Sequence, residues 1–204
     1  MGKENAARKN QATVLNMDES KENKQIIDKG WNMELFGKSD ARVVNGARRS
    51  PFHIITAEEE LELIKEIESI GAATINIYGD NLFCFNDTRA KGTGYIDDLD
   101  IIIVRGNVFP DLISGSVHPR DIMSSRAVLA HEYYGHRRHR GTRLPAGCWQ
   151  DEFRASRIAA EYTPNLTDEE IMHLALDAIE RKRESGVVVN MDKFMRRIIY
   201  GYQS

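Results

Sequence analysis

The spacing of apolar residues in the C-terminal half of the chain predicts a run of helices. From Pro119 onward, apolar side chains recur every three or four residues, as they do on the buried face of an amphipathic helix. The pattern Thr167-Asp-Glu-Glu170 is a capping box, which marks the N-terminus of a helix. We predict helices over roughly residues 123–140, 150–162, 167–184 and 191–200.

The pattern upstream predicts one more helix and three strands. Thr56-Ala-Glu-Glu59 is a second capping box, and apolar residues follow it at helical spacing until Gly71 ends the helix. Residues 73–78 and 82–85 are predicted as strands joined by a hairpin turn at Gly79-Asp80. Residues 99–104 form an apolar, β-branched run that is typical of a buried strand.

A few strands followed by a run of helices predicts an α+β fold. Residues 1–50 consist mostly of Lys, Glu, Asn and Asp and contain few large apolar side chains. Such a segment buries too little apolar surface to fold, so it is predicted as a weakly ordered charged tail or linker with at most one short docking helix. Residues 51–204 are predicted to form the folded domain.

Composition and charge exclude several classes of function. The net charge of −3 gives no support for a nucleic-acid or membrane-surface partner. Residues 1–16 have no apolar segment of the kind found in signal peptides, and the apolar run Ile101 to Val104 is far too short to span a bilayer. With only Cys84 and Cys148, no disulfide framework is expected. We therefore expect a cytoplasmic protein, or one exported without an N-terminal signal peptide.

The residues that carry chemistry lie in two of the predicted helices. One contains His131-Glu132-Tyr133-Tyr134-Gly135-His136, and the other contains Asp151-Glu152-Phe153-Arg154-Ala155-Ser156. A catalytic zinc ion takes three protein ligands, usually imidazole and carboxylate, and leaves one position for water. The ion lowers the pKa of that water, and a neighbouring carboxylate accepts the proton. Two His on one helix, with a Glu beside the first, supply two ligands and a base.

The spacing of the two His residues predicts a distortion of their helix. In the common HExxH pattern the two His are four residues apart, which places them roughly 40° apart on one face. Here they are five residues apart, which in an ideal α-helix leaves them roughly 140° apart, too far to share one ion. We therefore predict a π-bulge between His131 and His136, and Gly135 is the residue type that tolerates such a distortion most easily.

The two motifs together resemble those of the dipeptidyl peptidase III family of zinc metallopeptidases, HExxGH followed by EExRAE. The first motif is intact as His131, Glu132, Gly135 and His136. In the second, Asp151 stands for Glu and Ser156 for the usual acidic residue, and the gap between the motifs is much shorter here than in the family. The chain is also too small for the family's two-lobed architecture, so the resemblance implies a shared site design without dipeptidyl peptidase specificity.

The resemblance implies a role for each motif residue. His131, His136 and Glu152 correspond to the zinc ligands, and Glu132 corresponds to the general base. Asp151 is expected to accept a hydrogen bond from a ligand imidazole, with the role of an alternative ligand left open. Arg154 is expected to pair with a nearby carboxylate, and one of Tyr133 and Tyr134 is a candidate to contact the oxyanion or substrate.

Two weaker resemblances extend this interpretation. The fifteen residues between His136 and Glu152 are similar to the spacing in thermolysin-like gluzincins, and the stretch from Ser124 through Ala155 resembles zincin-like domains of bacterial polymorphic toxins and mobile-element proteins. They imply a zincin-like fold in which a small β-sheet, including residues 99–104, packs on the active-site helix, with further C-terminal helices behind it. The expected function is that of a zinc-dependent hydrolase, a peptidase, that cleaves a protein or peptide.

Several alternatives stay open at this point. The chain could be a non-catalytic zincin-scaffold binding module of a toxin or mobile-element protein, although an intact Glu132 argues against it. An inhibitory partner protein is also compatible with a toxin-like enzyme. His139, three residues after His136, is the main competing ligand. The basic cluster Arg137, Arg138, Arg140 and Arg143 could contact phosphate, but cations at a helix C-terminus also suit the helix dipole.

Overall fold

The structure, a computed structural model, describes residues 48–111, 118–141 and 144–201. The predicted tail therefore lies almost entirely outside the described residues. The strands are β1 (Phe83–Phe85), β2 (Gly94–Ile96) and β3 (Ile101–Val104). The α-helices are α2 (Ala57–Ser69), α3 (Pro119–Ile122), α4 (Ser125–Ala130), α5 (Trp149–Tyr162), α6 (Asp168–Glu184) and α7 (Lys193–Tyr200). Shorter helical segments are η2 (Asp97–Leu99), η3 (Gly106–Val108), the π-helix η4 (His131–His136) and η5 (Arg137–His139).

The three strands form one small mixed sheet in the order β1-β3-β2. β1 runs parallel to the central strand β3, and β2 runs antiparallel to it with Tyr95 opposite Ile102. All four residues of β3 are buried, which explains why this strand is continuously apolar and does not alternate. The predicted strand 99–104 is confirmed for its last four residues, while Leu99 ends the 3₁₀ turn η2.

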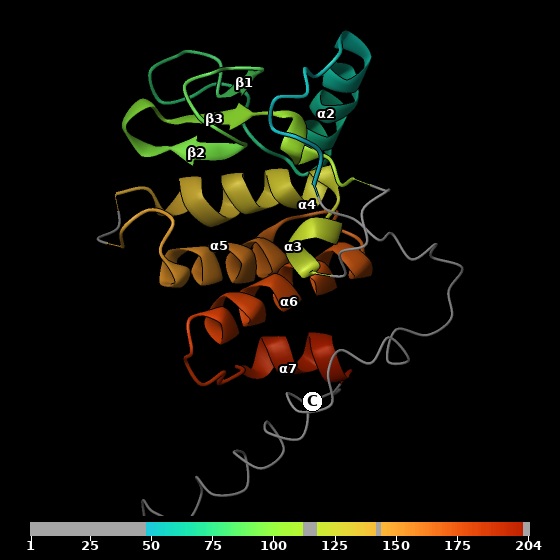
Figure 1. Cartoon of the computed structure of the whole chain (residues 1–204), viewed down its shortest axis with the longest axis vertical. Coiled ribbons are helices and arrows are strands. Elements are labelled where there is room, and N and C mark those ends of the chain that lie inside the picture. The colour runs from blue at the N-terminus through green and yellow to red at the C-terminus, as the bar shows by residue number, and fades with distance from the viewer. Residues whose placement is uncertain (1–47, 112–117, 142–143, 202–204) are drawn as a thin grey trace, which may run out of the picture. The chain divides into compact units, whose positions relative to one another are not determined.

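The helices are stacked in layers beneath the sheet (Figure 1). The sheet covers the helix formed by α4 and η4, α5 lies against the other side of that helix, and α6 and then α7 follow. Leu63 and Ile67 of α2, Ile102 of β3, Leu129 of α4 and Leu174 of α6 belong to one buried apolar cluster. The core is therefore shared by the sheet and the helices, as expected for an α+β domain.

Local sequence signals explain where the helices begin. Thr56 and Thr167 each accept a hydrogen bond from the residue three positions on, Glu59 or Glu170, whose side chain in turn accepts from the threonine N–H. Both predicted capping boxes are thus confirmed, and with them the starts of α2 and α6. None of the helices in the described ranges is long and apolar enough to cross a membrane.

The predicted strand at residues 73–78 is wrong, although the chain does reverse at the predicted turn, where Leu82 N–H donates to Thr74 O and Asn76 N–H donates to Asp80 O. Only one isolated bridge, between Ile75 and Asn81, forms in this segment. The side-chain oxygen of Asn76 accepts hydrogen bonds from the N–H groups of Tyr78 and Asp80, each at 2.9 Å. This side chain curls the backbone into a turn before a strand can extend. The strand that pairs with β3 instead is β2, in a segment that lacks a strong apolar signal.

Candidate metal centre

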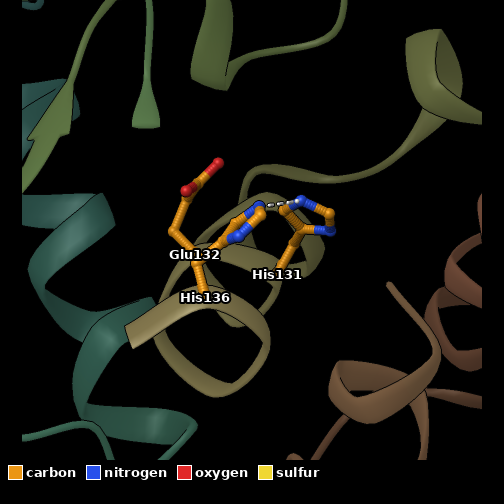
Figure 2. Close-up of side chains that lie close together, drawn as sticks. All are labelled: His131, Glu132 and His136. Carbon is orange, nitrogen blue, oxygen red and sulfur yellow. Dashed lines mark hydrogen bonds between the residues drawn. The ribbon is translucent and has the colours of Figure 1, made fainter. Parts of the chain in front are cut away.

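The π-helix η4 brings two imidazole rings together in spite of their five-residue spacing. The Nε2 atoms of His131 and His136 lie 3.0 Å apart, and the two rings meet nearly edge to face (Figure 2). The extra residue of the π-turn carries His136 back to the face that His131 occupies. The bulge predicted from the spacing is therefore confirmed.

Gly135 lets the helices η4 and α5 pack closely against each other. A Cβ atom at this position would lie 2.5 Å from the carbonyl oxygen and 2.6 Å from the Cα of Ala155 in α5. Only glycine lets η4 approach the backbone of α5 this closely. The φ angle of Gly135 is not in the left-handed region. Glycine is therefore needed here for the close approach of η4 to α5 and not for its conformational freedom.

In both rings, Nε2 faces the other imidazole and Nδ1 faces away from it, toward a polar side chain of α5. The space between the two Nε2 atoms is called the shared point below. His136 Nδ1 lies 3.1 Å from Asp151 Oδ2, and His131 Nδ1 lies 2.9 Å from Ser156 Oγ. Arg154 in turn contacts Asp151. Asp151 and Arg154 therefore make the contacts expected of them. With Nδ1 donating to these partners, each ring presents the lone pair of Nε2 to the shared point.

The carboxylate of Glu152 also faces the two rings. Its Oε2 lies 3.4 Å from His131 Nε2 and its Oε1 lies 3.7 Å from His136 Nε2. Arg181 of α6 holds Oε2 at 3.1 Å. Burial alone would raise the pKa of Glu152, but His131, Arg181 and His136 outweigh it and lower this pKa to about 2. Glu152 thus presents an ionised carboxylate to the two Nε2 atoms.

Glu132 is held by the sheet. Its side chain points from η4 toward the strands (Figure 2), and Oε2 accepts a hydrogen bond of 2.9 Å from the backbone N–H of Tyr95 in β2. Ligand atoms of His131, Glu132 and His136 all lie within 4.8 Å of one another, so these three residues, of which His136 is partly buried and the other two are buried, could also hold a metal ion. Either of two carboxylates, Glu132 or Glu152, therefore lies close enough to the two imidazoles to be the third ligand of a metal ion.

The two imidazoles respond in opposite ways to their surroundings. Burial lowers the pKa of each ring, but a hydrogen bond that His131 donates to Glu152 and the charges of Glu132 and Glu152 raise the pKa of His131 above its ordinary value. Burial and the neighbouring His131 lower the pKa of His136. Without a metal ion, His131 is therefore the ring that takes up an additional proton more readily, and His136 is the ring that stays neutral.

The expected oxyanion contact from Tyr133 or Tyr134 is not supported. The Tyr133 hydroxyl accepts a hydrogen bond of 3.0 Å from Ala73 N–H, and the Tyr134 hydroxyl donates to Ile70 O at 2.7 Å. Both rings are buried in the core on the side of α2. They anchor the helix formed by α4 and η4, called the site helix below, to the end of α2. Neither tyrosine lines the cavity described below.

The basic cluster makes contacts within the protein. Arg137 binds both oxygens of Asp100, at 2.9 and 3.0 Å, and its guanidinium lies over the ring of Tyr133. Arg138 stacks on Tyr134, and Arg140 lies 3.4 Å from Asp100. Arg143 lies outside the described residues. Arg137 and Arg140 therefore fasten the end of the site helix to Asp100, next to β3, while Arg138 packs on a tyrosine of the same helix.

A cavity of about 340 Å³ opens over the site. Its wall combines the site helix, α5 and the sheet edge, with His131, Glu132, His136 and Glu152 beside Gly94 and Tyr95. His139 also lines it, but it is not among the residues whose ligand atoms converge in the described part of the chain. The cavity places the polar groups where a substrate could reach them.

Two contacts of the site were missed from the sequence. Tyr95 acts through its backbone N–H, which no side-chain pattern reveals. Asp177 of α6 contacts Ser156, and it lies 21 residues away on another helix. The sequence gives only a weak signal for Asp177, which is a polar residue at a helical position that should face the core.

Comparisons of this chain with protein-family models, with curated proteins and with solved structures found no match. The site itself, a buried His-Glu-His group that could hold a metal ion, is thus the observation from which a function can be argued.

Proposed function

We propose that this chain is a zinc-dependent hydrolase of the zincin type that cleaves peptide bonds. The observation that carries the proposal is that the Glu152 carboxylate faces the two neighbouring Nε2 atoms of His131 and His136 in the wall of the cavity. In a tetrahedral zinc site with bonds of about 2.0–2.2 Å, ligand atoms are separated by about 3.4 Å. The two Nε2 atoms lie 3.0 Å apart, and the nearest Glu152 oxygen is 3.4 Å from His131 (Oε2) and 3.7 Å from His136 (Oε1), so all three distances are close to this spacing.

The surrounding contacts suit a metal ion as well. Neutral imidazole is the ligand form, and a partner at the second nitrogen fixes the ring and its tautomer. Asp151 and Ser156 occupy those positions for His136 and His131. The low pKa of Glu152 keeps this carboxylate ionised at neutral pH. Two imidazoles and one carboxylate are a common donor set of catalytic zinc sites.

Assigning Glu152 as the ligand leaves Glu132 available as the base. Zinc bound at this site would polarise a substrate carbonyl and lower the pKa of a water molecule. Glu132 would accept a proton from the attacking water and pass it to the nitrogen of the leaving amine. The hydrogen bond from Tyr95 N–H occupies Oε2 of Glu132, which orients the carboxylate and leaves Oε1 to take the proton.

The position of β2 supports a peptide as the substrate. β2 is an edge strand of the sheet, and Tyr95 directs its N–H away from β3 toward Glu132. Thr93, Gly94 and Tyr95 line the cavity. An extended peptide that lies along this edge would bring its backbone carbonyls past the metal centre.

The alternative that Glu132 is itself a ligand favours a non-catalytic, metal-holding module, and two matched variants separate it from the enzyme. Glu132→Gln and Glu152→Gln each replace one carboxylate by an amide of the same size. We expect Glu132→Gln to retain about one zinc per chain and to lose roughly 10²–10⁴-fold in hydrolysis of a fluorogenic peptide library. We expect Glu152→Gln to lose zinc affinity.

The measurements are metal analysis of dialysed protein and rates from the peptide library. The reverse pattern, with zinc lost from Glu132→Gln and kept by Glu152→Gln, would assign Glu132 as the ligand and overturn the mechanism. Full zinc with wild-type hydrolysis in Glu132→Gln would show that another group is the base.

A further inference from the structure

Helix α6 places a buried acid behind the candidate metal centre. Asp177 has no exposed surface, and its Oδ2 lies 2.5 Å from the hydroxyl oxygen of Ser156 in α5. The same hydroxyl lies 2.9 Å from Nδ1 of His131. Asp177, Ser156 and His131 thus form a chain of hydrogen bonds from α6 through α5 to η4.

The direction of each hydrogen bond in this chain follows from chemistry. An ionised carboxylate only accepts, so the Ser156 hydroxyl donates its one proton to Asp177. The hydroxyl oxygen can then only accept from the ring, which places the proton of neutral His131 on Nδ1. Nε2 is left with its lone pair, and this is the atom that faces His136 and Glu152.

The charge of Asp177 is balanced inside the domain. Arg120 Nε lies 3.4 Å from Oδ1, and Arg181 Nε lies 3.3 Å from each carboxylate oxygen. Arg181 also reaches Glu152 at 3.1 Å. One turn of α6 therefore contacts two of the candidate ligands, His131 through Ser156 and Glu152 directly.

We infer that Asp177 is a positioning residue of the metal centre, which sets the tautomer and orientation of His131 through the hydroxyl of Ser156. The inference rests on the proposed function, because it concerns the affinity of the same site for zinc. It also explains a departure noted in the sequence. The motif that this site resembles has an acidic residue where Ser156 stands, and here the acid comes from α6 and reaches the ring through the serine.

Two variants interrupt the chain at different links. Asp177→Asn keeps the size of the side chain but can donate to Ser156, which frees the serine proton to turn toward Nδ1 and favours the wrong tautomer. Ser156→Ala removes the link and leaves both arginine contacts of Asp177 in place. We expect each variant to bind zinc roughly 10–100-fold more weakly than the wild type, as for loss of other hydrogen bonds to ligand residues.

The matched control is Glu170→Gln. Glu170 is a buried acid on the same helix, but its partners are Arg126 and Ser124, each at 2.6 Å, and the N–H of Thr167 in the capping box. This variant should lower the thermal midpoint of the metal-free protein while leaving its zinc affinity within about twofold of the wild type. A change in zinc affinity at Asp177 that Glu170→Gln does not reproduce is not a general effect of losing a buried charge.

Rescue provides the second readout. In the exchange variant Ser156→Asp with Asp177→Ser, the carboxylate stands on α5 and the hydroxyl on α6. We expect this variant to recover at least part of the zinc affinity lost in Asp177→Asn. Zinc dissociation constants from competition with a chromophoric chelator, and thermal midpoints of the metal-free variants, give the result.

The outcomes separate this inference from the proposed function. If the wild type binds zinc tightly and both Asp177→Asn and Ser156→Ala match it, the positioning role is refuted and the proposed metal centre stands. Should Asp177→Asn fail to fold, Ser156→Ala alone decides, because it keeps the ion pairs of Asp177. A wild-type protein that binds no zinc would overturn both.

Discussion

The helical layers and the small sheet contribute in different ways to the same site. The helices from α4 to α6, with the π-helix η4 between them, are closely packed and rich in buried charged contacts, and they hold His131, His136 and Glu152. The sheet has strands of three and four residues, and its flanking loop exposes Ile75, Ile77 and Tyr78. The candidate ligands are thus held by helices, and the sheet contributes Tyr95 N–H to Glu132, the proposed base.

This difference has a functional meaning. A metal ligand must be held to within a fraction of an ångström, and packed helices with polar contacts behind them achieve this. The base and the substrate need access, and a sheet edge that opens onto a cavity provides it. Changes in the helical layers should therefore affect metal binding, whereas most changes in the sheet and its loop should leave metal binding intact.

The largest effect on the metal centre is expected where two helices touch. Gly135→Ala would place a methyl group 2.5 Å from the backbone of Ala155, so η4 and α5 must separate. We expect a loss of roughly 1–3 kcal/mol in the free energy of unfolding, together with weaker zinc binding, because Glu152 would move away from the His rings. Chemical denaturation and zinc titration measure the two effects.

Gly94→Ala is the control in the sheet. A Cβ atom at Gly94 would meet nothing within 4 Å, although this residue also lines the cavity. Stability and zinc affinity should both stay close to wild type. Equal losses from the two glycine variants would refute the contrast between tightly packed helices and a tolerant sheet.

A smaller effect, on stability, is expected at Asp100. Its ion pair with Arg137 joins the site helix to the sheet. Burial alone would raise the pKa of Asp100, but hydrogen bonds from Arg137, Ile77 N–H and the Tyr95 hydroxyl lower it to about 2 from an ordinary value of 3.8. A lowered folded-state pKa stabilises the protein above the unfolded-state pKa, and the benefit disappears as the pH falls from about 4 to about 2.

The shift at Asp100 corresponds to about 2 kcal/mol. We therefore expect Asp100→Asn to be less stable than the wild type at neutral pH, with a difference that shrinks below pH 4. Urea denaturation of both proteins across this range measures it. A difference that does not change between pH 6 and pH 2.5 would mean that the ion pair does not titrate as described.

The smallest effect is expected at the loop beside the sheet. Ile77 is 57% exposed, so Ile77→Ala should change the free energy of unfolding by less than about 0.5 kcal/mol. Ile102 in β3 has no exposed surface, and Ile102→Ala should cost about 2–5 kcal/mol. Similar losses from the two variants would place this loop in the core and remove the distinction.

The sequence predicted the helical layers and the site better than the sheet, for physical reasons. The helices carry capping boxes and apolar residues at regular spacing, and these are local signals. The π-helix followed from geometry alone, because two His five residues apart can share one ion only if the helix gains a residue. The contacts of Asp151 and Arg154 followed from their place beside Glu152.

The remaining features depend on contacts that no local pattern carries. β2 forms because β3 lies beside it, and the segment 73–78 fails to extend because Asn76 turns the backbone. The tyrosines of the motif face α2 because the π-turn rotates them there, away from the cavity. Asp177 reaches His131 only once α6 packs on α5.

The most direct test of the metal centre is anomalous diffraction at the zinc edge from crystals grown with zinc. We predict one peak within about 2.0–2.2 Å of His131 Nε2, His136 Nε2 and a carboxylate oxygen of Glu152, with Glu132 outside bonding distance. A peak bound by Glu132 in place of Glu152, or the lack of any peak between the two imidazoles, would contradict the account.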